Sequence, residues 1–181
     1  MSIRIVKERD LDKLYSLSFD YEDPGDFLPL NFISETDYIK EFRQTGFWKD
    51  NCGKLIIEDS SGEVVGEIGC FKTTHYVDGR EVYYRIFSGY RNKGYASEAL
   101  RLFIRLFFES SSMNRLQAVI VDGNEVSEYL IKKQCFRYEG TMKEARYISG
   151  KLTDLKLFSL VRREWQSPGC NEGWSHQKSS E

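Results

Sequence analysis

The segment between Tyr84 and Ala96 constrains this chain most, because it reads as a strand that passes through a short glycine-containing turn directly into a long amphipathic helix. A helix N-terminus carries unpaired backbone N–H groups and the positive end of the helix dipole, so it attracts anions. Gly94 removes the side chain where the backbone would approach an anion most closely, and Ala96 keeps the next contact small. The segment therefore predicts a strand–turn–helix unit that binds phosphate.

Two better-known phosphate-binding patterns are absent from the sequence. A dinucleotide-binding turn requires G-x-G-x-x-G and a P-loop requires G-x-x-x-x-G-K-[ST], and neither is present. A charged strand-to-helix turn that binds nothing is the alternative interpretation of the segment. Other features of the sequence are therefore needed to distinguish a ligand site from an ordinary turn.

The composition fits one globular domain. A chain of 181 residues is long enough for a hydrophobic core, and 40% hydrophobic with 30% charged residues is ordinary for such a domain. A formal net charge of −2 argues against a nucleic-acid partner, which would require a basic face. The N-terminus has no apolar run of signal-peptide length, and Arg101 and Arg105 interrupt the most apolar helix, so we expect no membrane segment and a cytoplasmic location.

The four cysteines lie far apart in the sequence and include no C-x-x-C pair: Cys52, Cys70, Cys135 and Cys170. Only His75 and His176 could join them as soft ligands, so the sequence predicts no zinc site and no other metal. Cysteines in a reducing compartment behave as small apolar residues, and we expect this of Cys70 and Cys135.

Apolar periodicity and turn residues predict strands and helices along the whole chain. Ser34 and Asp37 have capping-box spacing at the start of a helix, and Asp10 is a candidate N-cap. Three antiparallel strands should precede the phosphate-binding turn, and a parallel strand should follow its helix. The expected strands cover residues 2–7, 54–58, 63–71, 81–87, 116–121, 136–139, 145–149 and 155–161, with helices starting near residues 11, 35, 95 and 125, a loop at 20–31 and a polar, mobile tail at 166–181.

This order of elements, together with the pattern Arg91-x-x-Gly94-x-Ala96, resembles the GNAT superfamily of acetyl-CoA-dependent N-acetyltransferases. The resemblance extends from residue 2 to about residue 165. It implies an α/β (α+β) GNAT acyltransferase fold, with a mixed central sheet of about seven strands flanked by about four helices. It also implies a single GNAT domain at residues 1–165, followed by the tail.

Further matches point to the RimJ/RimL-like branch, whose members acetylate protein N-terminal amines and, in some cases, small amines. The matching segments are Gly66-Glu67-Ile68-Gly69, Glu81-Val82-Tyr83-Tyr84-Arg85, Asn124-x-x-Ser127 and Cys135-Phe136-Arg137-Tyr138-Glu139-Gly140. Cys135 and Tyr83 replace glycines of that pattern, and Arg146 stands where some ribosomal-protein acetyltransferases carry a glutamate. We expect the Tyr83 ring to narrow or reshape the acceptor pocket.

The resemblance implies acetyl-CoA as the co-substrate. Its pyrophosphate would bind the backbone N–H groups of residues 91–96, and its pantetheine arm would bind the backbone of Ile86 and Phe87 where two strands diverge. Asn124 would contact the coenzyme, although a plain N-cap is the alternative interpretation of this residue. The predicted coenzyme-binding residues are Ile86, Phe87, Arg91, Asn92, Lys93, Gly94, Tyr95, Ala96 and Asn124.

Acetyl transfer to an amine needs a base for the amine and a proton for the departing thiolate, but no covalent enzyme intermediate. The resemblance makes Glu81 the first candidate for the base, with Glu67 and Glu144 as alternatives; a solvated strand glutamate is the competing interpretation of Glu81. Ser127 would help to protonate the thiolate, unless it bonds only to its own helix backbone.

The acceptor amine is expected between the first two helices and the closing hairpin. Acidic and aromatic residues gather there in the sequence, which suits a cationic amine, although charged loops are usually only solvated. They are Asp20, Tyr21, Glu22, Asp23, Asp26, Phe27, Phe32, Glu35 and Asp37. The alternatives left open are a protein N-terminal α-amine or a small molecule such as an antibiotic or a polyamine, and a monomer or a homodimer. A second hypothesis is a non-catalytic regulatory module of GNAT fold that binds acyl-CoA.

Overall fold

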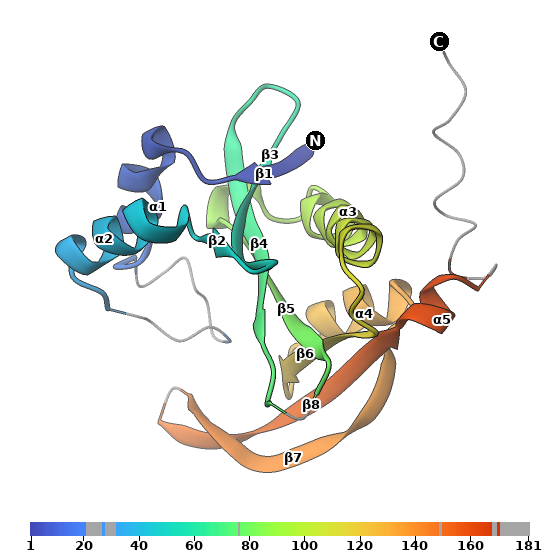
Figure 1. The fold of residues 1–181 in the computed structure, drawn as a ribbon. Coiled ribbons are helices and arrows are strands. Elements are labelled where there is room, and N and C mark those ends of the chain that lie inside the picture. The colour runs from blue at the N-terminus through green and yellow to red at the C-terminus, as the bar shows by residue number, and fades with distance from the viewer. Residues whose placement is uncertain (21–26, 28–31, 76, 149, 168–169, 171–181) are drawn as a thin grey trace.

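The computed structural model describes residues 1–20, 27, 32–75, 77–148, 150–167 and 170. These residues form a mixed sheet in the order β1-β3-β4-β5-β6-β8-β7, with the short strand β2 paired beside β3 (Figure 1). The strands are β1 (Ser2–Ile5), β2 (Trp48–Lys49), β3 (Cys52–Glu58), β4 (Val64–Lys72), β5 (Gly79–Ile86), β6 (Arg115–Val121), β7 (Arg137–Ile148) and β8 (Lys151–Val161). The helices are α1 (Leu11–Leu17), α2 (Glu35–Thr45), α3 (Tyr95–Ser110), α4 (Glu125–Lys133) and α5 (Arg162–Trp165), with 3₁₀ turns η1 (Glu8–Asp10) and η2 (Ser88–Tyr90).

The sheet separates two helical layers. Helices α1 and α2 lie on one side of it, and α3 and α4 lie on the other (Figure 1). Strand β3 shows the alternation that this arrangement requires. Leu55 and Ile57 belong to the buried cluster that includes α3 and α4, whereas Ile56 packs with Leu14 of α1 and Tyr38 of α2. Both faces of the sheet therefore bury apolar surface, and the strands at its centre are fixed from both sides.

Helix α3 is held against the sheet by one apolar stripe, as its periodicity predicted. The buried positions recur at helical spacing: Ala99, Leu100, Phe103, Ile104, Phe107 and Phe108. Full burial of a large apolar side chain stabilises a fold by about 1.5–3 kcal/mol. The packing of this stripe fixes the position of the helix N-terminus, which carries the predicted phosphate-binding turn.

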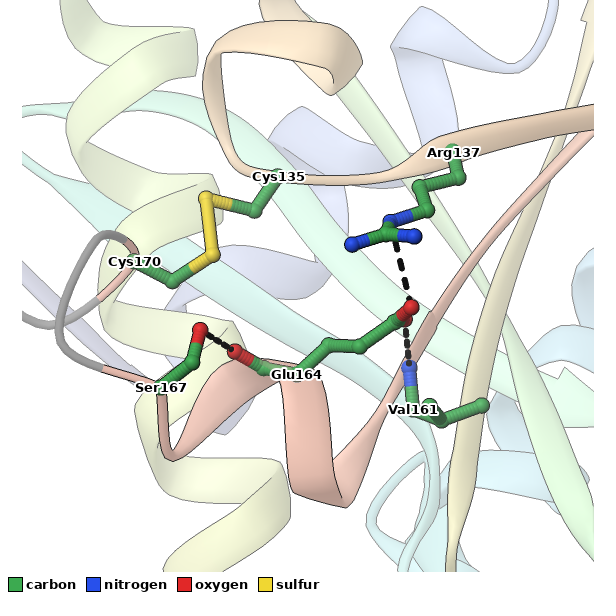
Figure 2. Close-up of a disulfide and its surroundings, with 6 residues drawn as sticks. All are labelled: Cys135, Arg137, Val161, Glu164, Ser167 and Cys170. Atoms are coloured by element: carbon green, nitrogen blue, oxygen red, sulfur yellow. Dashed lines mark hydrogen bonds and ion pairs between the residues drawn. A yellow bond between two sulfur atoms is a disulfide. The ribbon is translucent and has the colours of Figure 1, made fainter.

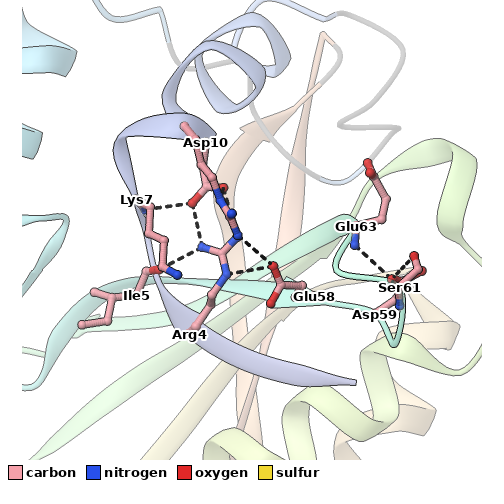
Figure 3. Close-up of polar contacts among 9 residues, drawn as sticks. Arg4, Ile5, Lys7, Asp10, Glu58, Asp59, Ser61 and Glu63 are labelled. Carbon is pink, nitrogen blue, oxygen red and sulfur yellow. Dashed lines mark hydrogen bonds and ion pairs between the residues drawn. The ribbon is translucent and has the colours of Figure 1, made fainter.

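Both predicted N-cap residues occupy the N-cap position of their helix, but only one of them makes a side-chain cap. Ser34 Oγ accepts a hydrogen bond from the Asp37 N–H at 3.1 Å, so α2 begins as predicted. Asp10 makes no side-chain cap at α1. Its carboxylate instead accepts hydrogen bonds from two Arg4 nitrogens, at 2.7 and 3.0 Å, and from the Lys7 N–H at 2.8 Å (Figure 3). The guanidinium that strand β1 brings to Asp10 is a stronger partner than a helix N–H group.

The strand that leads into the predicted phosphate-binding turn, β5, diverges from its neighbour β6. As predicted, β3, β4 and β5 are antiparallel, and β6 is parallel to β5. Pairing between β5 and β6 is confined to Gly79–Glu81 and Arg115–Gln117. Strand β5 then continues to Ile86, and β6 continues to Val121 while paired with β8 over its whole length. A break in the sheet therefore opens immediately after Glu81.

The last part of the sheet differs from the prediction. Residues 136–139 and 145–149 were expected as two strands, but Arg137–Ile148 is one strand, β7, with irregular pairing between Tyr138 and Gly140 and between Met142 and Arg146. Strands β7 and β8 form a long ribbon that projects past the other strands (Figure 1). The described residues contain eight strands and five α-helices, compared with the expected seven or so strands and four or so helices. The difference arises because β2 and α5 are too short to show periodicity in the sequence.

Cys135 is bonded to Cys170 in a disulfide, with Cα atoms 6.1 Å apart (Figure 2). The prediction that Cys135 behaves as a small apolar residue is therefore wrong, because the turn after α4 brings it within bonding distance of Cys170. Cys70 is buried and free, as expected. Nearby, the Arg137–Glu164 ion pair, at 3.1 Å, connects α5 to the start of β7 (Figure 2).

Candidate active site

The turn between β5 and α3 presents an uncapped helix N-terminus. Gly94 is the N-cap of α3, with a left-handed φ of 82° and no side-chain hydrogen bond to the first turn. A Cβ added at Gly94 would meet no heavy atom within 4 Å, so space is available over the turn. Asn92 is also left-handed, with a φ of 62°, and Arg91 and Lys93 beside it are exposed. The left-handed backbone at Asn92 and Gly94 and the open space over Gly94 fit the pyrophosphate of a coenzyme.

Side chains hold this turn from the opposite face of the sheet. The Tyr90 hydroxyl donates to Glu63 Oε1 at 3.0 Å, and Lys13 Nζ of α1 lies 2.5 Å from the same oxygen. Lys13 Nζ also lies over the rings of Tyr90 and Phe87, at 5.4 and 5.9 Å from their centroids. The Arg91 side chain donates from Nε to the Ile86 carbonyl at 3.1 Å. These contacts place the turn before any ligand binds.

Ile86 and Phe87, the two predicted pantetheine-binding residues, differ in the hydrogen-bond partners of their backbone groups. The Phe87 N–H donates to the Val65 carbonyl at 3.0 Å, and its carbonyl accepts from the Tyr90 N–H at 2.9 Å. Because hydrogen-bonding directions alternate along an antiparallel strand, Ile86 and Tyr84 turn their backbone groups away from β4, toward the break beside β6. The structure therefore favours Tyr84 and the N–H of Ile86, rather than Phe87, as the backbone groups available there, since the Ile86 carbonyl already accepts from Arg91.

Glu81 lies where β5 and β6 diverge. It pairs with Gln117 across the two strands, and Gln117 Nε2 donates to its Oε2 at 2.9 Å. Burial raises the pKa of the Glu81 carboxyl, while the Gln117 hydrogen bond and the charge of Arg146 oppose that rise. A half-buried carboxyl with a raised pKa at a break in a sheet is a suitable position for a base.

The two alternative carboxylates have other surroundings. Glu67 of β4 forms an ion pair with Lys54, with Nζ and Oε2 2.9 Å apart. Glu144 is exposed in an irregular part of β7, and its N–H donates to Asp154 Oδ1 at 2.8 Å. Of the three predicted carboxylates, Glu81 is the one at the junction of β5 and β6.

The N-terminus of α4 is built as the sequence predicted. Asn124 Oδ1 accepts a hydrogen bond from the Ser127 N–H at 3.1 Å, so Asn124 is an N-cap and Ser127 lies in the first turn. Asn124 follows shortly after Val121, the last residue of β6, which forms one edge of the break. The cap explains the residue type at 124 by itself, and it does not exclude a contact with the coenzyme.

Tyr83, the unusual residue on β5, lies over the sheet. A Cβ added at Gly69 of β4 would lie 3.0 Å from the Tyr83 hydroxyl, and the Tyr83 ring stacks on Phe71 with centroids 6.2 Å apart. Phe71 is 46% exposed and pairs across the strands with Glu81. An aromatic wall thus borders the candidate base. Of the acidic residues predicted near the acceptor, Glu22, Asp23 and Asp26 lie outside the described residues.

Sequence reasoning missed Gln117 and the electrostatic effect of Arg146 on Glu81. A polar residue inside the apolar run of β6 was a usable signal for Gln117, but its pairing with Glu81 depends on the strand register across α3. Arg146 reaches the region through the ribbon of β7 and β8, whose course the motif could not indicate.

Comparison with known proteins agrees with this geometry. A family model described as Acetyltransferase (GNAT) domain matches residues 1–137. The chain therefore belongs to the GNAT acetyltransferase family, as its motifs predicted. It is 33% identical over 111 residues to the uncharacterized N-acetyltransferase p20 of Bacillus licheniformis, covering 61% of this chain and 62% of that protein. It is 24% identical over 166 residues to the SPbeta prophage-derived uncharacterized N-acetyltransferase YokL of Bacillus subtilis, covering 92% of both.

Solved structures show the same fold. The spermidine N-acetyltransferase from Vibrio cholerae, in complex with CoA and spermine, has a TM-score of 0.80 at 15% identity, covering 92% of this chain and 98% of that one. A GNAT-family acetyltransferase from Bacillus anthracis has a TM-score of 0.73 at 21% identity, covering 90% and 95%. None of the helices in the described part of this chain has the length and hydrophobicity needed to cross a bilayer.

Proposed function

We propose that this chain is an acetyl-CoA-dependent N-acetyltransferase that transfers an acetyl group to a primary amine by direct attack. The observation that carries the proposal is the break between β5 and β6, which begins at Glu81 and extends toward the uncapped N-terminus of α3. Such a site can bind a long ligand with a phosphate at one end and place its other end beside a carboxylate.

The coenzyme would be held mainly by backbone groups. The N–H groups of residues 91–96 would bind its pyrophosphate, with Arg91 and Lys93 adding positive charge. The backbone of Ile86 and Tyr84 would bind the pantetheine arm, and Asn124 would approach it from α4. When bound, acetyl-CoA supplies an acetyl thioester whose carbonyl carbon the amine attacks.

Glu81 would remove a proton from the acceptor amine, directly or through water. Its raised pKa favours this role, because a base is most effective when its pKa lies closer to the working pH. Ser127, in the first turn of α4, would donate a hydrogen bond to the sulfur as it leaves. The amine nitrogen forms its bond to the acetyl carbon as the carbon–sulfur bond breaks, the proton that Glu81 removes passes to solvent, and the thiolate takes up a proton, so no covalent enzyme intermediate is needed.

The acceptor is a primary amine, either a protein N-terminal α-amine or a small molecule. The aromatic wall of Phe71 and Tyr83 beside Glu81 suits an amine on a slender apolar group. The positive charge of Arg146 opposes a polycation at the same place and favours an acceptor that is neutral or acidic around its amine.

One screen tests this proposal. The protein is incubated with acetyl-CoA and a panel of peptides and small amines, and the release of free thiol is followed together with the mass of each acceptor. Thiol release with one acetyl group added to an amine is the expected result. Calorimetric binding of acetyl-CoA without turnover on any amine would support a non-catalytic acyl-CoA-binding module instead, and absence of binding would reject both.

A further inference from the structure

Tyr84 has a buried hydroxyl that no interaction within the structure explains. The residue lies on β5 and packs against the core cluster on the α3 and α4 side of the sheet. Its hydroxyl oxygen is buried and has no hydrogen-bond partner among the described residues. Leaving a buried hydroxyl without a partner costs roughly 1–3 kcal/mol, so its retention points to a hydrogen bond that forms in the working state.

Ser127 is the polar group beside this hydroxyl. Burial raises the pKa of the Tyr84 phenol, and its side-chain contact with Ser127 opposes that rise. Asn124 fixes the first turn of α4 through the Ser127 N–H, so the serine side chain is presented to Tyr84 from a capped helix start. The two hydroxyls come from β5, which forms one edge of the break, and from α4, the helix that follows β6 at the other edge.

We propose that Tyr84 is a positioning residue for Ser127: its hydroxyl donates a hydrogen bond to Ser127 Oγ and thereby directs the Ser127 proton toward the sulfur of the coenzyme. This inference rests on the proposed function and goes further, since it assigns a task to a residue outside the predicted site. A serine hydroxyl accepts one hydrogen bond while it donates another, so a single contact is enough to orient it.

Tyr84 acts in this arrangement without giving up its proton. Its pKa lies above the usual 10, whereas an ordinary thiol has a pKa of about 8.5, so proton transfer from the phenol to a thiolate would be unfavourable. No bond to Tyr84 is formed or broken. Its effect is to strengthen the hydrogen bond that the departing thiolate receives from Ser127. The Ser127 hydroxyl becomes a better donor because it accepts a hydrogen bond from Tyr84 at the same time.

The pKa of the thiol of bound CoA tests the proposal without any acceptor. Thiolate absorbs in the ultraviolet, so the wild type, Tyr84→Phe and Ser127→Ala can be titrated in complex with CoA. Both substitutions should raise that thiol pKa by about one unit, because a hydrogen bond to the thiolate is weakened or lost. In the Ser127→Ala background, Tyr84→Phe should produce no further shift.

Tyr38→Phe is the matched control. The Tyr38 hydroxyl on α2 is also buried and without a hydrogen-bond partner in the described part of the chain, but it lies in the cluster on the other side of the sheet. Its removal should leave the thiol pKa of bound CoA unchanged. Circular dichroism and calorimetric affinity for CoA establish that each variant is folded and loaded.

Kinetics provide a second measurement once an acceptor is known. Tyr84→Phe should lower kcat about tenfold with the KM for acetyl-CoA unchanged, and this loss should vanish in the Ser127→Ala background. An unchanged thiol pKa in Tyr84→Phe, or an equal shift with and without Ser127, would overturn the inference. A wild type that binds CoA but acetylates no amine would instead reject the proposed function, and the thiol titration would still decide the role of Tyr84.

Discussion

The pKa of Glu81, at the point where β5 and β6 diverge, is subject to opposing effects. Burial favours its neutral form, while the amide of Gln117 and the charge of Arg146 favour its ionised form. The net effect raises its pKa above the usual 4.5. A carboxylate in this position can accept a proton from an amine and release it again to water.

Replacing Glu81 by glutamine should lower kcat about 100- to 10,000-fold and leave the affinity for acetyl-CoA unchanged. Wild-type activity should fall as the pH decreases through the raised pKa of Glu81, and the variant should lack this acid limb. Raising the pH should restore part of the variant's rate, because more of the amine is then neutral. Profiles of kcat against pH check this, with Glu144→Gln as the comparison; a larger loss in Glu144→Gln would transfer the role to β7.

Gly94 should be essential for coenzyme binding but not for folding. Gly94→Glu puts a negatively charged side chain into the open space over the turn, so affinity for acetyl-CoA should fall at least about tenfold, or 1.4 kcal/mol. Gly62→Glu is the matched control, because Gly62 has a similar φ of 86° and equally open surroundings in the turn between β3 and β4. Calorimetry on both variants would contradict the assignment if they bound the coenzyme equally well.

At the scale of elements, the disulfide connects the turn after α4 with the segment after α5, two parts that are distant in the sequence. It closes a loop of 35 residues in sequence, which contains β7, β8 and α5. Trp165, at the end of α5, stacks on Phe108 of α3 with ring centroids 5.1 Å apart. The last helix is therefore attached both by apolar packing and by a covalent bond.

Cys170→Ser should lower the free energy of unfolding by about 2–4 kcal/mol under oxidising conditions and leave it unchanged in the presence of a reductant. Truncation after Trp165 should behave as Cys170→Ser does, since the remaining tail offers little apolar surface. Denaturant unfolding of the three proteins in both buffers measures these values. A truncated protein less stable than Cys170→Ser under reduction would mean that the tail docks on the domain.

The elements that could be predicted from the sequence are the long ones with a regular apolar pattern. Helix α3 and the strands β3 to β6 carry clear apolar patterns, and the motif at Gly94 predicted the turn that joins β5 to α3. Strand β7 was not predicted as one strand, because most of its residues are polar or exposed and show no regular apolar alternation. The roles inferred for Gln117 and Tyr84 depend on which atoms meet across β5, β6 and α4, and no local pattern records that.

At the scale of the whole molecule, a buried charge network attaches the N-terminal segment to the sheet. Arg4 of β1 bonds to Asp10 of η1 and, through Nε, to Glu58 of β3 at 3.1 Å (Figure 3). Asp10 is only 4% exposed, and its pKa is lowered by hydrogen bonds from Arg4 and Lys7 although burial opposes this. The network therefore stabilises the fold most when Asp10 is ionised.

Asp10→Ala should destabilise the protein by about 3–5 kcal/mol at neutral pH, because it leaves the Arg4 guanidinium with a single carboxylate. The pKa of Asp10 is lower in the folded state, so its contribution is present above its usual 3.8 and disappears as the pH falls through the folded value. Thermal unfolding at several pH values checks this. Arg9→Ala is the control, since Arg9 is 66% exposed and its pairing is worth at most about 1 kcal/mol.

The short contact between β5 and β6 also has a mechanical consequence. Among the described residues, the strands β1–β5 and the strands β6–β8 are joined within the sheet by only three residue pairs. We therefore expect this junction to be a flexible part of the sheet, which a ligand lying beside it would stiffen. Amide hydrogen exchange should show this as a difference between alternate residues along β5. The N–H groups of Tyr84 and Ile86 should exchange quickly in the free protein and slowly with acetyl-CoA, whereas that of Phe87, bonded to Val65, should be slow in both. Uniform protection along β5 in the free protein would mean that the two halves already move as one body.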